Sequence, residues 1–264
     1  MPVEPVKLSQ MNPGSSGIPV ADAAAAREAP GWYGKISTLG DFAQRRLPVE
    51  FVQVSDAWLS RTLLASHQQL GNHWLDCYLT APPMRFAWAP GVAGAHWWFG
   101  VLMPSCDNVG RYFPLLIAQR RTSPPLDAVA LNHLEQWFDH LVKAATLTLG
   151  ERATVEAFEQ ALDNAPPWPA PSHASGATAA LPAVASSEVG SGSGSVSGTS
   201  SASYAFGYRV SVGEWLHGVA LDALKARVSG CSIWWRQGDA TRDTEAEVVR
   251  GLPEPAAFAR MLLG

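Results

Sequence analysis

A low-complexity segment near residues 166–203 is the feature that most constrains the fold of this chain. It is rich in serine, glycine, alanine and proline and contains the repeat Gly190-Ser-Gly-Ser-Gly-Ser. Such a segment buries too little apolar surface to offset the entropy lost on ordering it, so we expect a disordered loop. Only about 60 residues follow it, which is thin for an independent domain. Because each doubling of loop length costs only about 0.6 kcal/mol, we predict that it interrupts a single domain spanning residues 30–264.

The first 29 residues also have low complexity and no usable apolar period, and we expect a disordered leader there. They lack the apolar core of an export signal, and no window of the chain approaches the ~20 apolar residues of a membrane span. The three cysteines form no C-x-x-C pair, which is typical of reduced thiols. These features predict a cytoplasmic protein.

The remaining sequence alternates between strand and helix periods. Short apolar runs predict strands at residues 32–36, 85–89, 97–103, 113–120, 231–236 and 246–250. Helical spacing predicts helices at 49–70, 125–150, 214–228 and 255–263, and a shorter one capped by Thr154. Pro90-Gly91 and residues 108–110 supply turns between successive strands. This order favours an α/β (α+β) fold with a mainly antiparallel sheet flanked by helices.

Two pairs of adjacent tryptophans indicate how the sheet is covered. In Trp97-Trp98 and Trp234-Trp235, neighbouring side chains point to opposite faces of a strand. Each pair therefore places one large apolar side chain on either face. We expect helices to cover both faces; the alternative is a partly exposed aromatic edge that binds a partner.

The motifs of the common catalytic sites are missing. The stretch Gly31-Trp-Tyr-Gly-Lys35-Ile has only two residues between its glycines and no hydroxyl after its lysine, so it fails the phosphate-loop pattern. Ser105 and Cys106 lie in no nucleophile motif, and the histidines have no metal-ligand spacing. A net charge of -4 gives no general attraction to nucleic acid. We therefore expect no enzymatic activity, no cofactor and no metal.

Charged residues stand singly in two turns that are rich in glycine. Asp41 follows Gly40, and Arg111 follows Gly110 a few residues after Asp107. A bidentate pair between Asp41 and Arg111 would fix the two turns relative to each other. We predict that such a pair braces the loops rather than catalysing a reaction.

These turns carry a resemblance to a known family. Gly31, Gly34, Lys35, Gly40, Asp41 and Phe42 match the motif G-x-x-G-K-x-P-x-x-G-D-F of the TagF (ImpM) family of bacterial type VI secretion, with Ser37 in place of its proline. Four further stretches resemble the family: residues 74–82, 100–115 and 232–236, and Gly251-Leu-Pro with Phe258. The resemblance covers residues 31–162 strongly and 214–264 moderately.

The resemblance implies a longin- or profilin-like fold and a cytoplasmic regulator that represses type VI secretion after translation. It implies that the protein acts by binding a forkhead-associated (Fha) scaffold protein, without catalysis. From the net charge and the lack of a long apolar window, we expect no nucleic-acid partner and no membrane insertion. Two alternatives stay open: a small-molecule or nucleotide-binding enzyme using Lys35, Asp41 and Arg111, and a structural subunit of the apparatus. The candidate interaction residues are Lys35, Gly40, Asp41, Phe42, Ser105, Asp107, Gly110, Arg111, Trp234 and Trp235.

Overall fold

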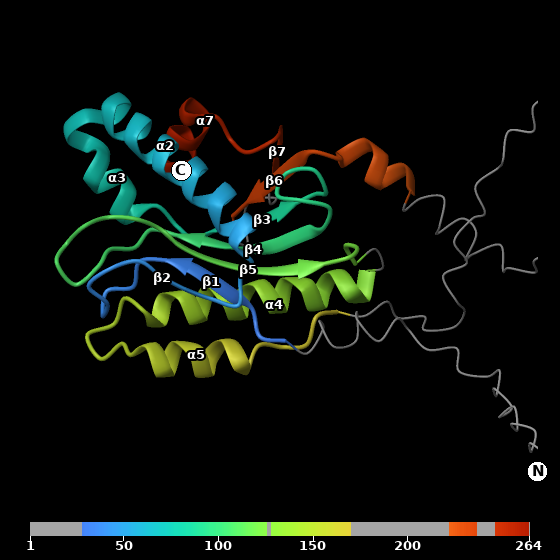
Figure 1. The fold of residues 1–264 in the computed structure, drawn as a ribbon, viewed down its shortest axis with the longest axis horizontal. Coiled ribbons are helices and arrows are strands. Elements are labelled where there is room, and N and C mark those ends of the chain that lie inside the picture. Colours follow the sequence, from blue (N-terminus) through green and yellow to red (C-terminus); the bar gives the residue numbers. More distant parts are fainter. Residues whose placement is uncertain (1–27, 126–127, 170–221, 237–245, 264) are drawn as a thin grey trace, which may run out of the picture. The chain divides into compact units, whose positions relative to one another are not determined.

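The computed structural model describes residues 28–125, 128–169, 222–236 and 246–263 (Figure 1). The chain divides into two units, and the named helices and strands belong to the unit made of residues 18–174 and 224–264. Most of the predicted leader, the predicted loop from residue 170 onward, and the first part of the predicted helix 214–228 lie outside the described residues. The division into domains therefore stays a prediction.

A seven-stranded sheet forms the centre of this unit, in the order β2-β1-β5-β4-β3-β6-β7. Every neighbouring pair in this sheet is antiparallel. The strands are β1 (Gly31–Gly34), β2 (Ala43–Arg45), β3 (Met84–Trp88), β4 (Trp97–Met103), β5 (Leu115–Arg121), β6 (Cys231–Trp235) and β7 (Ala246–Arg250). The chain on either side of residues 170–221 thus contributes to one sheet, since β6 pairs with β3.

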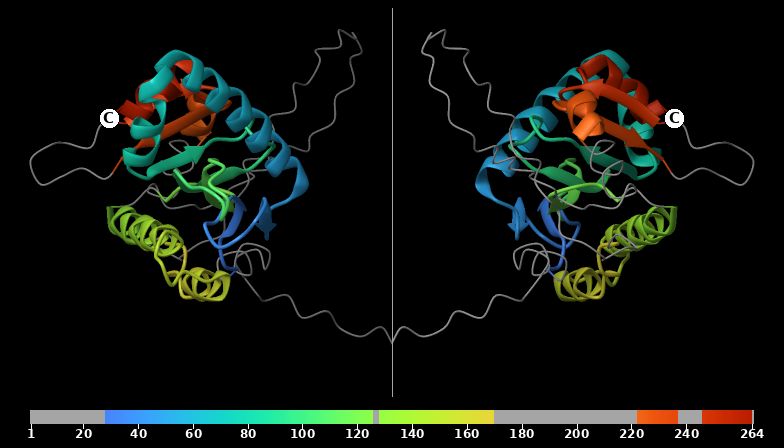
Figure 2. Two further views of the ribbon diagram at one scale, coloured as in Figure 1. Left: turned by 90° about the vertical axis from the view of Figure 1, so that its left-hand side faces the viewer. Right: turned by 90° about the vertical axis from the view of Figure 1, so that its right-hand side faces the viewer.

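Helices cover both faces of the sheet, as Figures 1 and 2 show. One face carries α2 (Val49–Leu70), the short helices η1 (Gly71–His73) and α3 (Trp74–Thr80), and α7 (Pro255–Leu263). The other face carries α4 (Ala128–Leu147) and α5 (Val155–Asp163). Each face has its own hydrophobic core. The predicted α+β class, with a mainly antiparallel sheet between helices, is confirmed.

The adjacent tryptophans divide between the two cores. Trp98 and Trp234 belong to the core beneath α2 and α7, and both are buried. Trp97 lies in the core beneath α4, and Trp235 packs edge to face against Phe138 of α4 at 5.0 Å. The prediction that helices cover both faces is confirmed at these positions.

Most predicted elements agree with the structure. The predicted bounds of α2, β4, β7 and α7 coincide with the observed ones, and Thr154 caps α5 by accepting a hydrogen bond from the Ala157 N–H at 3.1 Å. Among the described strands and α-helices, periodicity missed β2 and α3, which are short, with three and seven residues. Among the described helices, none has a long enough apolar stretch to cross a membrane.

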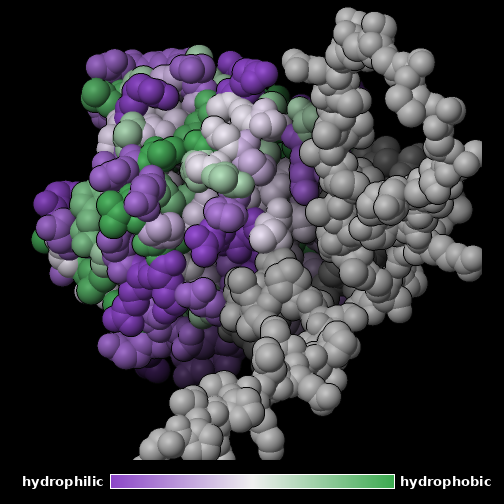
Figure 3. Space-filling view, turned by 45° about the vertical axis from the view of Figure 1, so that its right-hand side comes forward, coloured by the Kyte–Doolittle hydropathy of each residue, from purple (hydrophilic) through white to green (hydrophobic). Residues whose placement is uncertain are grey.

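Figure 3 shows how polarity is distributed over one side of this unit. Hydrophilic residues dominate the lower part of the view, which corresponds to the α4 and α5 layer. Hydrophobic residues reach the surface at and above the level of the sheet.

Candidate functional site

The two glycine-rich turns meet at one end of the sheet. The first, residues 35–42, follows β1, and the second, residues 104–114, joins β4 to β5 (Figure 1). They meet because β1 lies beside β5, with Gly34 opposite Leu115. The Asn108 N–H donates to the Leu39 carbonyl at 3.0 Å, joining the turns. We call residues 35–42 and 104–114 together the loop junction.

Gly34 permits the close approach of the two turns. Its φ is +133°, a conformation that side chains with a Cβ rarely adopt. A Cβ at this position would lie 2.1 Å from the Pro114 carbonyl oxygen. The second glycine of the motif is thus required by the backbone contact between the turns.

A buried carboxylate stands at the centre of the loop junction. The Asp107 side chain has no exposed surface, and the Lys35 side chain is 6% exposed. Asp107 Oδ2 pairs with Lys35 Nζ at 3.0 Å and with Arg111 Nε at 2.7 Å. Its Oδ1 accepts from the backbone N–H groups of Val109 at 3.1 Å and Arg111 at 2.8 Å. Both carboxylate oxygens are therefore satisfied by donors of the same two turns.

These donors determine the protonation state of Asp107. Burial by itself would raise the pKa of the carboxyl group. The hydrogen bonds from the Arg111 backbone, Lys35 and the Arg111 side chain outweigh burial and hold the pKa of Asp107 well below its usual value. Asp107 is thus an anion at neutral pH and braces the turn.

The predicted pair between Asp41 and Arg111 is wrong, because Arg111 pairs with a different carboxylate. Arg111 pairs with Asp107, while its Nη2 donates to the Gly40 carbonyl at 2.6 Å. Asp41 accepts instead from the N–H of the adjacent Phe42 at 2.8 Å. Arg111 still links the two turns, but it does so through a backbone oxygen because Asp41 turns back onto its own peptide.

Aromatic residues support the loop junction from beneath. The Tyr78 hydroxyl of α3 donates to the Ser105 carbonyl at 2.9 Å and accepts from the Ser105 N–H at 3.0 Å. Burial raises the pKa of Tyr78, which therefore stays a neutral donor. Tyr78 also packs against Tyr112, and Phe42 against Phe113 at 4.7 Å. The backbone of the second turn is thereby held on a fixed helix.

Ser105 and Ser37 both serve as structural hydrogen-bond donors. The Ser105 hydroxyl is buried and donates to the Lys35 carbonyl at 2.8 Å. Ser37, which replaces the proline of the family motif, donates to the Thr148 carbonyl just beyond α4. The substitution thus adds a link between the first turn and the helix layer.

Large apolar side chains of the loop junction are exposed to the solvent. Phe42 is 45% exposed, Val109 67% and Tyr112 37%. Exposed leucines lie on the elements that contact the junction: Leu75 and Leu79 on α3, and Leu147 and Leu149 beside Thr148. A rigid end of the sheet therefore presents apolar side chains to the solvent.

Eight of the ten predicted residues fall within the loop junction. They are Lys35, Gly40, Asp41, Phe42, Ser105, Asp107, Gly110 and Arg111. Trp234 and Trp235 lie instead in β6, where the Trp234 indole donates to the Ser232 hydroxyl at 2.9 Å. This late motif stabilises the core and is not part of the junction.

Residues of α3 belong to the site but were missing from the prediction. Trp74 and Tyr78 stack at 4.8 Å, and both contact Tyr112. Their spacing of four residues places them on one helix face, which is the signal that could have identified them. Within the described residues, no group of histidine, cysteine and acidic side chains has the arrangement of a metal site.

Comparison with known proteins places this geometry in a family. A model of the TagF N-terminal domain, described as type VI secretion system-associated, matches residues 31–165, about half of the chain. The chain is also similar to PA0076 from Pseudomonas aeruginosa PAO1, known from a crystal structure at 2.05 Å resolution. The identity is 36%, the match covers 89% of this chain and 94% of that one, and the TM-score is 0.63. A comparison with curated proteins found no match.

The match confirms the resemblance seen in the turns. Both turns of the loop junction, together with α3, lie inside the matched residues 31–165. The chain therefore belongs to the TagF family of type VI secretion-associated proteins.

Proposed function

We propose that this chain is a non-catalytic cytoplasmic regulator that represses type VI secretion by binding a forkhead-associated scaffold protein through the loop junction. Membership of the TagF family supports the link to secretion. The observation that carries the proposal is the exposure of Phe42, Val109 and Tyr112 in the two turns that the buried, fully paired Asp107 braces.

Rigidity of the junction favours binding. Association is weakened by the entropy lost when loops become ordered, so a surface that is already ordered binds more tightly. Here the Asp107 cluster and the Tyr78 hydrogen bonds fix both turns. Aromatic side chains are also enriched among the residues that dominate interface energies.

The pairing of the charged residues supports a binding role over an enzymatic one. Lys35 and Arg111, which the alternative hypothesis uses as a polar cluster for a ligand, are both engaged by Asp107. A nucleotide or phosphate would have to compete with this buried carboxylate for both cations. Lys35 and Arg111 therefore support the binding surface rather than hold a ligand.

The test measures binding of the full chain to the purified forkhead-associated scaffold protein of the same host. Val109→Asp places a charge within the apolar surface, so we expect affinity to fall at least tenfold, because desolvating a carboxylate at an interface is costly. Val248→Asp is the matched control, since Val248 is a comparably exposed valine (58%) on β7. It should bind like the wild type.

The same variants test the cellular role. In a host that lacks this gene, the wild type and Val248→Asp should restore repression of secretion, and Val109→Asp should not. The proposal fails if the wild type binds no scaffold protein, or if the two variants behave alike. Melting curves establish that both variants are folded before binding is compared.

A further inference from the structure

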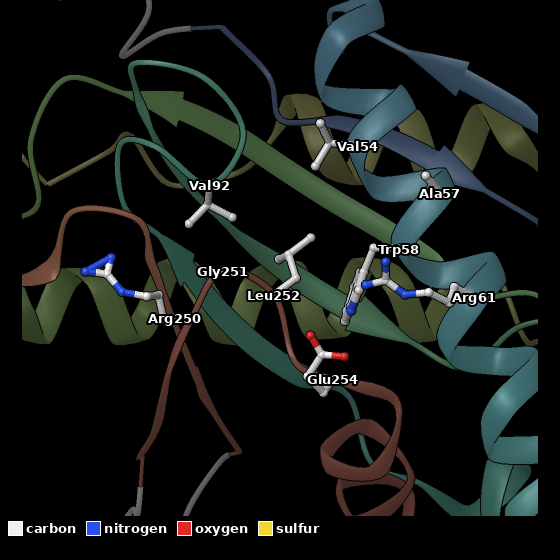
Figure 4. A pocket seen from close by; sticks show the side chains of 9 residues that line it. All are labelled: Val54, Ala57, Trp58, Arg61, Val92, Arg250, Gly251, Leu252 and Glu254. Atoms are coloured by element: carbon white, nitrogen blue, oxygen red, sulfur yellow. The ribbon is translucent and has the colours of Figure 1, made fainter.

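A second feature lies away from the loop junction, on the α2 side of the sheet. Three segments line an open groove of about 360 Å³ (Figure 4). They are one stretch of α2, the turn between β3 and β4, and the connection from β7 to α7. The lining residues are Val54, Ala57, Trp58, Arg61, Val92, Arg250, Gly251, Leu252 and Glu254.

The far wall of the groove is built from turns that hydrogen-bond to one another. The Gly230 N–H donates to the Pro90 carbonyl at 2.7 Å, and the Gly251 N–H donates to the Gly230 carbonyl at 2.6 Å. The Ser232 hydroxyl donates to the Gly251 carbonyl at 2.6 Å. The groove is therefore preformed, as ligand-binding grooves usually are.

Its floor is tied to α2. The Trp58 indole donates to the Pro253 carbonyl at 2.8 Å and is buried. The residues Gly251-Leu-Pro, part of the late family motif, thus position the groove. They take no part in the loop junction.

The lining combines an apolar centre with charged ends. Figure 4 shows Leu252 and Val92 near the centre, with Arg61 directed past Trp58 toward them and Arg250 at the opposite end. The Glu254 carboxylate is directed between the two arginines. In the part of the chain that the structure describes, neither Arg61 nor Arg250 forms an ion pair. The groove thus has an excess of positive charge beside an apolar floor.

We propose that this groove binds a short segment of a partner protein that carries aliphatic and acidic side chains. An aliphatic side chain would lie on Leu252 and Val92, and a carboxylate would pair with Arg61. Glu254 would accept a backbone N–H of the segment, which a carboxylate does well. The site shares no lining residue with the loop junction, so it can fail or hold independently of the proposed function.

The first experiment locates the contact. The probe is a synthetic peptide of alternating leucine and aspartate that carries one benzophenone group, and it is photocrosslinked to the full chain. Mass spectrometry should place the crosslinks in residues 54–61, 90–94 or 250–254. Crosslinks elsewhere, or none, would overturn the proposal.

The second experiment tests the charge. Fluorescence anisotropy should show at least tenfold tighter binding of the acidic peptide than of its lysine counterpart, since the latter meets two arginines. Arg61→Glu should reduce affinity for the acidic peptide at least tenfold. The matched control is Arg152→Glu, an exposed charge reversal between α4 and α5, which should leave affinity unchanged.

A further variant separates charge from shape. Val92→Ser alters the apolar centre of the groove without adding a charge or changing either arginine, and it should weaken binding of the acidic peptide as well. If Arg61→Glu and Arg152→Glu weaken binding equally, the attraction is only general electrostatics and the groove is not the site. Circular dichroism of each variant establishes that it is folded.

Discussion

Two buried charges in this protein are paired in opposite ways. In the loop junction, the carboxylate of Asp107 is fully buried and receives two backbone N–H groups and two cations. On β3, the guanidinium of Arg85 is buried and reaches Glu135 and, at 2.5 Å, Asp139 of α4. The side chains of these two carboxylates are 55% and 38% exposed.

The difference shows what each charge can fix. A buried carboxylate accepts hydrogen bonds from the backbone, so Asp107 determines the conformation of its own turn. A guanidinium only donates, and Arg85 finds its acceptors on another element, so it fixes α4 against the sheet. Its partners keep contact with water, whereas those of Asp107 include the buried Lys35.

The largest loss of stability is expected for Asp107→Ala. It leaves two backbone N–H groups without an acceptor and the buried Lys35 ammonium with only a long contact of 3.4 Å to the Arg111 carbonyl. Removing one partner of a buried ion pair is among the most destabilising kinds of substitution. Thermal unfolding should show a fall in melting temperature several times that of Asp41→Ala. Asp41 is the matched control because it is exposed and bonds only its neighbour's N–H. Equal falls would show that Asp107 does not brace the junction.

Acidification should remove the contribution of the Asp107 carboxylate to the stability of the wild type. Folding lowers the pKa of Asp107, so its stabilisation is present above the usual value of 3.8 and is lost as the pH falls from there toward the folded pKa. The difference in unfolding free energy between the wild type and Asp107→Asn should therefore shrink below about pH 4. A difference that grows on acidification would contradict the low pKa. Denaturant titrations at several pH values measure it.

Arg85→Ala should lower the free energy of unfolding by a smaller amount, about 1–3 kcal/mol. The reason is that Glu135 and Asp139 can be solvated when the guanidinium is removed. Arg85→Met keeps the packing beside Phe138 and should lose less. Urea unfolding of both variants gives the comparison. If Arg85→Ala costs as much as Asp107→Ala, exposure of the partners is not what separates the two clusters.

The exposure of the Glu159 side chain is intermediate between that of Asp107 and those of Glu135 and Asp139, so this residue tests the comparison further. Its side chain is 12% exposed, and it accepts from the Trp32 indole and, at 2.5 Å, from Arg46. We expect Glu159→Gln to cost about 1 kcal/mol, because the amide oxygen keeps one hydrogen bond and loses the charge. Burial opposes ionisation, but Arg46 and Trp32 lower the pKa of Glu159, so the effect should fade as the pH drops below 4.5. Free energies of unfolding at pH 7 and pH 3 measure the cost of the substitution and its decrease at low pH.

The smallest effects on stability are expected for Val109→Asp and Val248→Asp. Both side chains are more than half exposed, so each free energy of unfolding should stay within about 0.5 kcal/mol of the wild type. Chemical unfolding measures this directly. A large loss in Val109→Asp alone would mean that Val109 stabilises the junction rather than serving as contact surface.

Periodicity predicted the long elements well and the short ones poorly. The apolar spacing of α2 and the uninterrupted apolar run of β4 are both long enough to be read from sequence. The strand Ala43–Arg45 has three residues, and two of them are exposed, so it has no apolar pattern. Helix α3 has seven residues and follows a 3-10 turn, which breaks the period of α2.

The meeting of the two turns was predicted, but the carboxylate that pairs with Arg111 was not. The two turns were expected to be fixed relative to each other, and Asp107 and Arg111 were among the candidate residues. The carboxylate that binds Arg111 stands four residues before it in the same turn, where its Oδ1 also accepts two backbone N–H groups. The sequence Asp-Asn-Val-Gly-Arg is typical of such a side-chain-braced turn and could have indicated this.

By itself, the sequence determined the long helices and strands, the antiparallel class of the sheet and membership of the TagF family. These depend on local spacing and on motifs within short stretches. Only the tertiary structure decided that β1 lies beside β5, that Lys35 meets Asp107, and that three separate segments line one groove. Those properties arise from contacts between residues far apart in the chain, and burial of a charge depends on what the whole fold packs around it.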